Sequence, residues 1–146
     1  MNAIFMNDAI SQAKIAKEND EVPVGAVIVK DGEIIARAHN LTKTKTDATA
    51  HAEMLCIKAA QESLKTDHLF GCELYVTLEP CPMCAGAIIN SKISELIYGA
   101  SDPKGGAVDS LTNLFSLPFN HRPTVYGAVK EAECKKLLQD FFANKR

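Results

Sequence analysis

The segment from Leu74 to Tyr98 constrains the fold more than any other part of the chain. An apolar run from Leu74 to Leu78 predicts a strand, and Leu96 to Tyr98 predicts another. Between them, Pro82 suits the first turn of a helix, where its missing N–H has no partner to lose, and we expect this helix to run to about Asn90. A strand, a helix and a strand joined this closely predict a parallel crossover unit.

Further elements are predicted on both sides of this unit. Apolar residues at helical spacing predict a helix from Met6 to Ala16, and a β-branched run predicts a buried strand from Val22 to Val29. Asp31-Gly32 is typical of a tight hairpin turn, after which the chain returns as a strand from Ile34 to Ala38. Two more helices are predicted, over His51–Leu64 and around the apolar stripe Cys134, Leu137, Leu138, Phe141 and Phe142.

Length and charge limit the class of protein. The 146 residues, 47% of them hydrophobic, predict one domain over residues 1–146: an α/β fold, a three-layer α/β/α sandwich with a central mixed sheet of about five strands. No apolar run approaches the ~20 residues that a bilayer span requires, so no membrane partner is expected. Met1 to Phe5 lack a secretory signal, which predicts a cytoplasmic protein. The net charge of −2 means that any nucleic-acid partner must meet a local basic patch.

The cysteines indicate a metal site. Five cysteines in a cytoplasmic chain argue against a disulfide framework and favour metal binding, catalysis or burial. Cys81 and Cys84 form a Cys-x-x-Cys motif where a helix is predicted to begin, and His51 stands thirty positions before Cys81. An imidazole and two thiolates are zinc ligands, and three protein ligands leave the fourth tetrahedral position open, as in catalytic sites. We therefore predict one zinc ion per chain, held by these three residues.

Glu53 is the predicted catalytic residue. Residues two apart point to different sides of a helix, so His51 and Glu53 can meet one target only where the helix begins. Helix N-termini also favour thiolates and developing anions. A carboxylate that is not needed as a ligand can move protons, and the whole set suits hydrolytic deamination of an amidine-like carbon in a nucleobase.

These residues alone also allow a structural zinc site, in which all four ligands come from the protein. Cys56 or Cys72 could supply a fourth ligand and close the site, although Cys56 lies about 140° round the helix from His51. Cys72 precedes an apolar strand and suits a buried position. A closed site would belong to a zinc-stabilised binding module without catalysis, which unfolds when its metal is removed. Such a module leaves Glu53 without a purpose.

At these motifs the chain resembles the cytidine and deoxycytidylate deaminase superfamily, and within it most of all the bacterial adenosine deaminases that act on tRNA. The His-Ala-Glu and Pro-Cys-x-x-Cys motifs are shared with cytosine, guanine, deoxycytidylate and riboflavin-pathway deaminases, so they indicate the reaction and not the substrate. The narrower assignment rests on the flanking segments. The resemblance covers nearly the whole chain, in Glu21–Val27, His39-Asn40, Thr49–Glu53, Leu74–Ala87, Tyr98–Asp102, Asn120–Arg122 and the paired phenylalanines near the end.

The resemblance implies a cytidine deaminase-like fold, a homodimer, and zinc-dependent conversion of the wobble adenosine to inosine in a tRNA anticodon loop. A tRNA-Arg is the expected target, and DNA is not expected as a partner. The resemblance further implies that Asn40 hydrogen-bonds the flipped purine, that Val24 and the Pro23 region line the pocket, and that Asp102 touches the backbone of a flanking nucleotide. Ala48 departs from the family pattern, which commonly has a proline before the Thr-Ala-His-Ala-Glu motif, so a less rigid loop is expected there.

The main alternative activity is deamination of a free base or nucleotide of the guanine or cytosine type. Such an enzyme keeps the zinc set and Glu53 but needs no RNA groove, which suits the weak net charge. If RNA is the substrate, phosphate contacts are expected from basic residues in loops and at the end of the chain. The candidates are Lys43, Lys45, Lys104, Arg122, Lys145 and Arg146.

Overall fold

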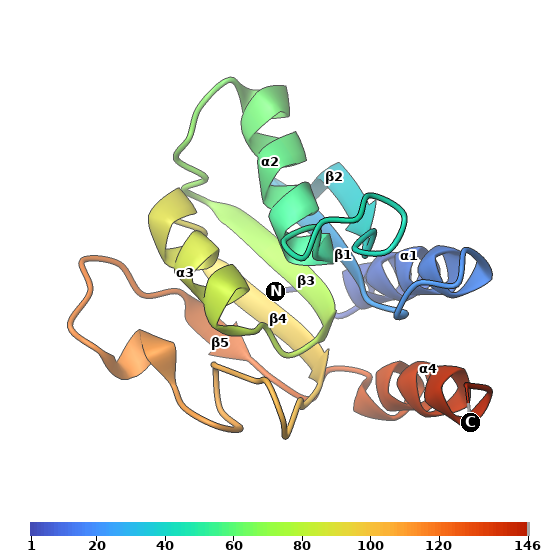
Figure 1. The fold of residues 1–146 in the computed structure, drawn as a ribbon. Coiled ribbons are helices and arrows are strands. Elements are labelled where there is room, and N and C mark those ends of the chain that lie inside the picture. The colour runs from blue at the N-terminus through green and yellow to red at the C-terminus, as the bar shows by residue number, and fades with distance from the viewer. Residues whose placement is uncertain (146) are drawn as a thin grey trace.

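Five strands form one mixed sheet in the computed structural model, which describes residues 1–145. The sheet confirms the predicted architecture: β1 pairs antiparallel with β2 and β3, whereas β3, β4 and β5 are parallel. Across the sheet the order is β2 (Glu33–His39), β1 (Gly25–Lys30), β3 (Cys72–Leu78), β4 (Glu95–Ala100) and β5 (Thr124–Tyr126), as Figure 1 shows.

Helices cover both faces of the sheet and complete the three predicted layers (Figure 1). The layer on one face consists of α2 (Ala52–Leu64) and α3 (Pro82–Ser91), and the layer on the other consists of α1 (Phe5–Glu18) and α4 (Glu131–Ala143). A short 3₁₀ helix, Leu114–Ser116, interrupts the long connection from β4 to β5. Within residues 1–145, no helix combines the length and the apolar character that crossing a membrane requires.

The β3–α3–β4 crossover confirms the predicted parallel unit and places the start of α3 at the carboxyl ends of the parallel strands. Leu74 pairs with Leu96 and Val76 with Tyr98 in parallel register. Pro82 occupies the first turn of α3, only four residues after β3 ends. Residues that follow the carboxyl end of β3 therefore lie beside residues that follow the carboxyl end of β4.

Two cores, one on each face of the sheet, account for the continuous apolar runs of the central strands. Leu74 and Val76 point into the core under α2 and α3, whereas Tyr75 and Ile97 point into the core under α1 and α4. A strand buried on both faces needs apolar residues at every position, not at alternate ones. A Cβ atom at Gly25 would overlap the backbone of α1, so glycine is required for this close approach.

Three details differ from the sequence-based predictions. The first strand begins at Gly25 and not at Val22, because the N–H of Val24 bonds to the nearby carbonyl of Val22 and Pro23 has no N–H to donate. Phe142 does not join the buried stripe of α4: it is 50% exposed, while Phe141 is buried. The fifth strand is only three exposed residues long, too short for a periodic pattern to locate.

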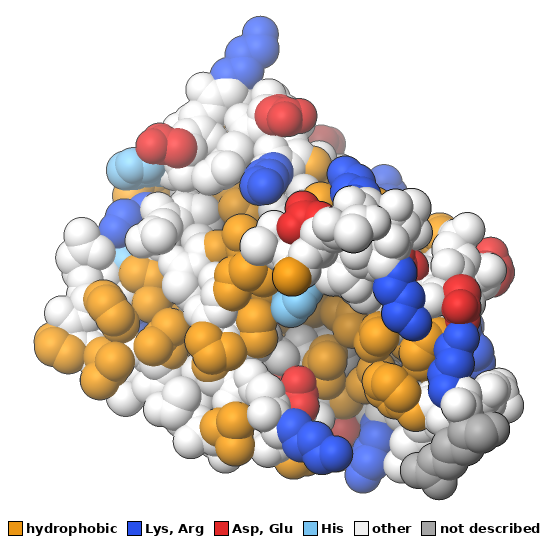
Figure 2. All heavy atoms as spheres, in the orientation of Figure 1, with side chains coloured by type: hydrophobic (Ala, Val, Ile, Leu, Met, Phe, Trp, Pro, Cys, Tyr) orange, Lys and Arg blue, Asp and Glu red, His pale blue; other side chains and the backbone are white. Residues whose placement is uncertain are grey.

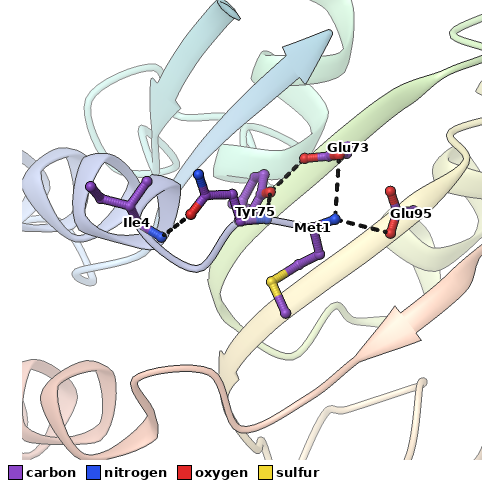
Figure 3. Close-up of polar contacts among 6 residues, drawn as sticks. Met1, Ile4, Glu73, Tyr75 and Glu95 are labelled. Carbon is purple, nitrogen blue, oxygen red and sulfur yellow. Dashed lines mark hydrogen bonds and ion pairs between the residues drawn. The ribbon is translucent and has the colours of Figure 1, made fainter. Parts of the chain in front are cut away.

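Polar contacts join the N-terminal segment to the first residues of β3 and β4 (Figure 3). The N–H of Asn2 donates to the hydroxyl of Tyr75 at 2.9 Å, and that hydroxyl donates to Glu73 at 2.5 Å. The terminal ammonium of Met1 lies 3.7 Å from the carboxylates of both Glu73 and Glu95. These contacts therefore lie near the amino ends of β3 and β4, away from the carboxyl end of β3 that leads into α3.

Candidate active site

Three potential metal ligands meet where two helices begin. His51 and Cys81 are the N-cap residues of α2 and α3, each with extended backbone, and Cys84 lies in the first turn of α3. The Nδ1 atom of His51 lies 3.6 Å from the Sγ atoms of both cysteines. The two helix N-termini therefore converge on one point and contribute the positive ends of their dipoles there.

The spacing of these atoms fits a tetrahedral zinc ion. With Zn–S near 2.3 Å and Zn–N near 2.0 Å, tetrahedral angles put a nitrogen and a sulfur ligand about 3.5 Å apart. The three ligand atoms lie within 4.8 Å of one another, and no other His, Cys, Asp or Glu of residues 1–145 joins the group. Cys56 and Cys72 are buried outside the group, so neither supplies the fourth ligand considered for them. The donor set fits a zinc site with one open position.

The two thiols of the cluster have opposite pKa shifts. The hydrogen bond from Cys84, together with that from His51, outweighs burial and lowers the pKa of Cys81 to about 4. The same contact between the sulfurs, with burial, raises the pKa of Cys84. Cys81 is thus a thiolate at neutral pH, which is the form that binds a metal ion.

Glu53 lies beside the cluster and is not a member of it. Its side chain is in the first turn of α2 and only 4% exposed. Burial raises the pKa of Glu53 to about 7. A carboxyl group with such a pKa can both accept and release a proton near neutral pH. Its catalytic role stays a prediction, which we test below.

A cavity of about 210 Å³ opens onto His51, Glu53 and Cys81, and Cys84 is buried outside its lining. The predicted substrate residues Val24, Asn40 and Asp102 line this same cavity, so the fold brings them next to the predicted ligands. The rest of the wall consists of Val22, Thr42, Ala52, Leu78 and Glu79. Figure 2 shows this side of the molecule, hollowed near its middle and bordered by hydrophobic side chains.

Asn40, which lines the cavity, carries a buried hydrogen-bond acceptor. The residue is 6% exposed, and its Oδ1 atom has no hydrogen-bond partner. The backbone N–H of Asn40 donates to the carbonyl of Val24 at 3.1 Å, which ties Asn40 to the segment just before β1. A buried carbonyl without a partner costs about 1–3 kcal/mol. A ligand with an N–H donor would remove that cost.

A buried carboxylate holds the loop that carries Asn40 and Thr42. Glu21, fully buried, accepts hydrogen bonds from the N–H groups of Lys43 at 3.1 Å and Thr44 at 2.7 Å. Burial alone would raise the pKa of Glu21, but these hydrogen bonds outweigh it and lower the pKa below its ordinary value of 4.5. The charged form of Glu21 therefore stabilises this loop.

We expect Glu21→Gln to lower the free energy of unfolding by about 1–2 kcal/mol at pH 7. Because the folded-state pKa is depressed, the contribution of Glu21 is complete above the ordinary pKa of 4.5 and is lost as the pH falls through the lower folded-state value. Denaturant titrations of the unchanged protein and of Glu21→Gln between pH 7 and pH 3 measure this. The difference between their free energies of unfolding should become smaller below about pH 4.5. A difference that stays constant would contradict this role. Glu18→Gln, at an exposed position of α1, is the control.

Sequence reasoning missed Thr42 and Glu79, which also line the cavity. Thr42 lies in a polar loop that offers no signal. For Glu79 a signal was available, since it is a single acidic residue between an apolar strand and the Pro80-Cys81 motif. Burial would raise the pKa of Glu79, but hydrogen bonds from Ser110 and from backbone N–H groups outweigh it and lower the pKa to about 2.

Three of the candidate phosphate-binding residues lie near the cavity. Lys104 and Lys145 line a hollow that shares Val22, Leu78 and Asp102 with the cavity. Lys43 and Lys145 both approach the ring of Phe141, with their Nζ atoms 6.0 and 5.2 Å from its centroid. Of the others, Lys45 is exposed in its loop, Arg122 lines a separate hollow, and Arg146 lies outside the described residues.

Comparisons with known families and proteins identify the family of the chain. The model of the MafB19-like deaminase family matches residues 2–146. A tRNA-specific adenosine deaminase of Bacillus subtilis (strain 168) is 51% identical, over 98% of this chain and 89% of the relative. A tRNA-specific adenosine deaminase of Aquifex aeolicus (strain VF5) is 50% identical, over 97% of this chain and 94% of the relative.

Solved structures are similar over the same region. A structure from studies of A-to-I editing by tRNA:A34 deaminases at the wobble position of transfer RNA superposes with a TM-score of 0.91 and 50% identity, covering 94% of this chain and all of that one. The guanine deaminase of Bacillus subtilis matches less well, with a TM-score of 0.66 and 41% identity over 69% of this chain and 66% of that one.

Proposed function

The chain belongs to the MafB19-like deaminase family, and from this premise we propose that it is a zinc-dependent tRNA adenosine deaminase that converts the wobble adenosine of an anticodon loop to inosine. The observation that carries the proposal is the cavity that joins His51, Cys81, Glu53 and Asn40. This arrangement occurs in a chain about half identical to tRNA-specific adenosine deaminases over nearly its full length. We expect a tRNA-Arg as the substrate.

His51, Cys81 and Cys84 would hold the zinc ion in this proposal. When bound, zinc supplies a nucleophile at neutral pH, because it lowers the pKa of a water molecule to about 7. The base must leave its stack to reach the cavity, so the anticodon loop, whose bases can splay out, suits this site better than a duplex. The free Oδ1 atom of Asn40 would accept a hydrogen bond from the base and orient it.

Glu53 would move the protons of the reaction. Its carboxylate accepts a proton from the attacking water and delivers it to the ring nitrogen beside C6 of the adenine. It then transfers a second proton from the new hydroxyl group to the leaving amino group. A C6–O bond forms, the C6–N bond to the exocyclic nitrogen breaks, and the products are inosine and ammonia. Burial of Glu53 keeps bulk water from competing for these protons.

We propose that residues 1–146 act as one domain, as a homodimer, in the cytoplasm. The basic side chains near the cavity, Lys43, Lys104 and Lys145, are the proposed phosphate contacts. They would supply the local positive charge that the net charge of −2 lacks. DNA is not a proposed partner.

Parallel incubations with tRNA-Arg bearing A34, free guanine and free cytosine test the proposal. We expect inosine at position 34 of the tRNA and no turnover of either free base. Turnover of a free base without any change in the tRNA would establish the alternative deaminase activity. A transcript carrying guanosine at position 34 is the matched control, since it keeps the loop but lacks the reacting amino group at C6.

We expect Asp102→Asn to lower kcat/KM for tRNA about tenfold, because a charged hydrogen-bond acceptor beside the cavity becomes neutral. The Oδ1 atom of Asp102 accepts from the N–H groups of Lys104 and Gly105, and asparagine keeps that acceptor, so the fold and the metal content should not change. Steady-state kinetics with tRNA and with free adenosine, together with metal analysis, check this. An equal loss with free adenosine would contradict a contact to the RNA backbone.

A further inference from the structure

The residues that follow β4, 101–110, form a loop that wraps around one carboxylate, that of Glu79. One oxygen of Glu79 accepts from the N–H of Asp102 at 3.0 Å and from the hydroxyl of Ser110 at 2.5 Å. The other oxygen accepts from three consecutive N–H groups, those of Val108, Asp109 and Ser110, at 2.8–3.1 Å. Five donors thus converge on a side chain that is 2% exposed.

The charge of Glu79 is balanced by this loop. Among residues 1–145, no Lys, Arg or His forms an ion pair with Glu79. Consecutive backbone N–H groups form a concave anion site, and here the protein fills that site with its own carboxylate. The loop backbone lies directly over the carboxylate, since a Cβ atom at Gly106 would overlap it.

Glu79 also connects the loop to the rigid part of the site. Its backbone N–H donates to the carbonyl of Ala100 at 2.8 Å, which extends the pairing of β3 with β4. The carbonyl of Pro80, the residue before Cys81, accepts from the N–H of Ala107 at 2.9 Å. Glu79 and Pro80, which directly precede Cys81, therefore hold the 101–110 loop in position.

The 101–110 loop lies between the active-site cavity and the adjoining hollow that Lys104 and Lys145 line. Asp102 lines both spaces, and Ser101, Pro103 and Lys104 line the hollow. The N–H of Asp102 is itself one of the five donors to Glu79. Any displacement of this anchor therefore moves the Asp102 carboxylate relative to the cavity.

We propose that Glu79 is a positioning residue for RNA binding, whose buried carboxylate holds the 101–110 loop and thereby Asp102 in place beside the active site. The inference rests on the proposed function, because the contact it positions is the one with tRNA. Glutamine in place of Glu79 puts an NH₂ group against backbone N–H donors, so at least one of these N–H groups, that of Asp102, loses its acceptor. The part of the loop around Asp102 is then held less firmly, while the N–H of Ala107 still donates to the carbonyl of Pro80.

The test measures RNA binding and turnover separately for Glu79→Gln, with an anticodon stem-loop RNA that contains A34. We expect the Kd for this RNA to rise about tenfold while kcat at saturating RNA stays within about twofold of the unchanged protein. Ile97→Val, a small truncation in the core under α1 and α4, controls for a general loss of stability and should leave the Kd unchanged. An unchanged Kd for Glu79→Gln would overturn the proposal.

A double variant tests whether Glu79 acts through Asp102. We expect Asp102→Asn alone to raise the Kd for this RNA about tenfold as well. If Glu79 acts through Asp102, Glu79→Gln combined with Asp102→Asn should raise the Kd no more than about tenfold in total, whereas independent effects would multiply to about 100-fold. Multiplying effects would overturn the proposal. If Glu79→Gln does not fold, Ser110→Ala removes one donor from the exposed side of the loop and should give a smaller rise in Kd. An unchanged Kd for Ser110→Ala would also contradict the proposal.

Hydrogen exchange separates failure of this inference from failure of the proposed function. Faster exchange of the backbone amides of residues 102–110 in Glu79→Gln, and not in Ile97→Val, is expected whatever the substrate. If the unchanged protein forms no inosine in tRNA, the proposed function fails, and the exchange data still decide whether Glu79 holds the loop. Unchanged exchange would overturn the role of Glu79 even in an active tRNA deaminase.

Discussion

Replacement of Glu53 with glutamine is expected to reduce the rate of deamination by about 10²–10⁴-fold, the range typical for a group that transfers protons. Glutamine has nearly the same shape, so the buried position in the first turn of α2 stays filled. It cannot accept the proton of the attacking water or return one to the leaving amine. Single-turnover kinetics with tRNA bearing A34 measure the effect.

The fold and the metal content should survive this substitution, because Glu53 is not a member of the ligand cluster. Glu62→Gln, at an exposed position of the same helix, is the matched control and should leave the rate unchanged. Turnover near normal in Glu53→Gln would refute the proton-transfer role. A loss of metal in that variant would identify Glu53 as a ligand and close the open position that the mechanism requires.

Substitution of Cys84 by alanine is expected to remove the metal and to abolish activity, with a loss of at least about 10³-fold. The cluster holds three ligand atoms within 4.8 Å of one another, and two of them are too few for stable zinc binding at a catalytic site. Elemental analysis should show metal content falling from one ion per chain to near zero. His51→Ala should behave in the same way.

Cys72→Ala is the matched control, since it removes a buried thiol that lies outside the cluster. This variant should keep one metal ion per chain and full activity. The metal-free proteins should also keep their helical circular dichroism, because two apolar cores stabilise the sheet from both faces without the metal. Unfolding on chelation would instead support the zinc-stabilised binding module.

Much of the site could be predicted because the relevant spacings are local. His51 and Glu53 stand two residues apart, as do Pro82 and Cys84, and each pair lies where a helix begins. At a helix N-terminus, backbone geometry limits the directions in which these side chains can point. The parallel crossover follows from a strand, a short connection and a helix in immediate succession, so it required no knowledge of distant contacts.

The roles of buried polar residues could not be predicted. Glu21 and Glu79 are acidic residues that a sequence pattern assigns to the surface, yet both are buried and hold loops that border the cavity. Their partners lie 22 to 31 positions further along the chain. A carboxylate that is neutralised by backbone N–H groups leaves no charge partner in the sequence, because every residue type except proline supplies the same donor.

By itself, the sequence determined the type of elements, their order and the residue types of the candidate metal ligands, since these depend on periodicity and on spacings of a few residues. Only the tertiary structure decided that Asn40 carries a free buried acceptor, that Asp102 and Val24 line one cavity, and that Glu79 anchors the loop beside it. The physical reason is that burial and hydrogen bonding between distant segments arise from packing of the whole chain, which no local pattern encodes.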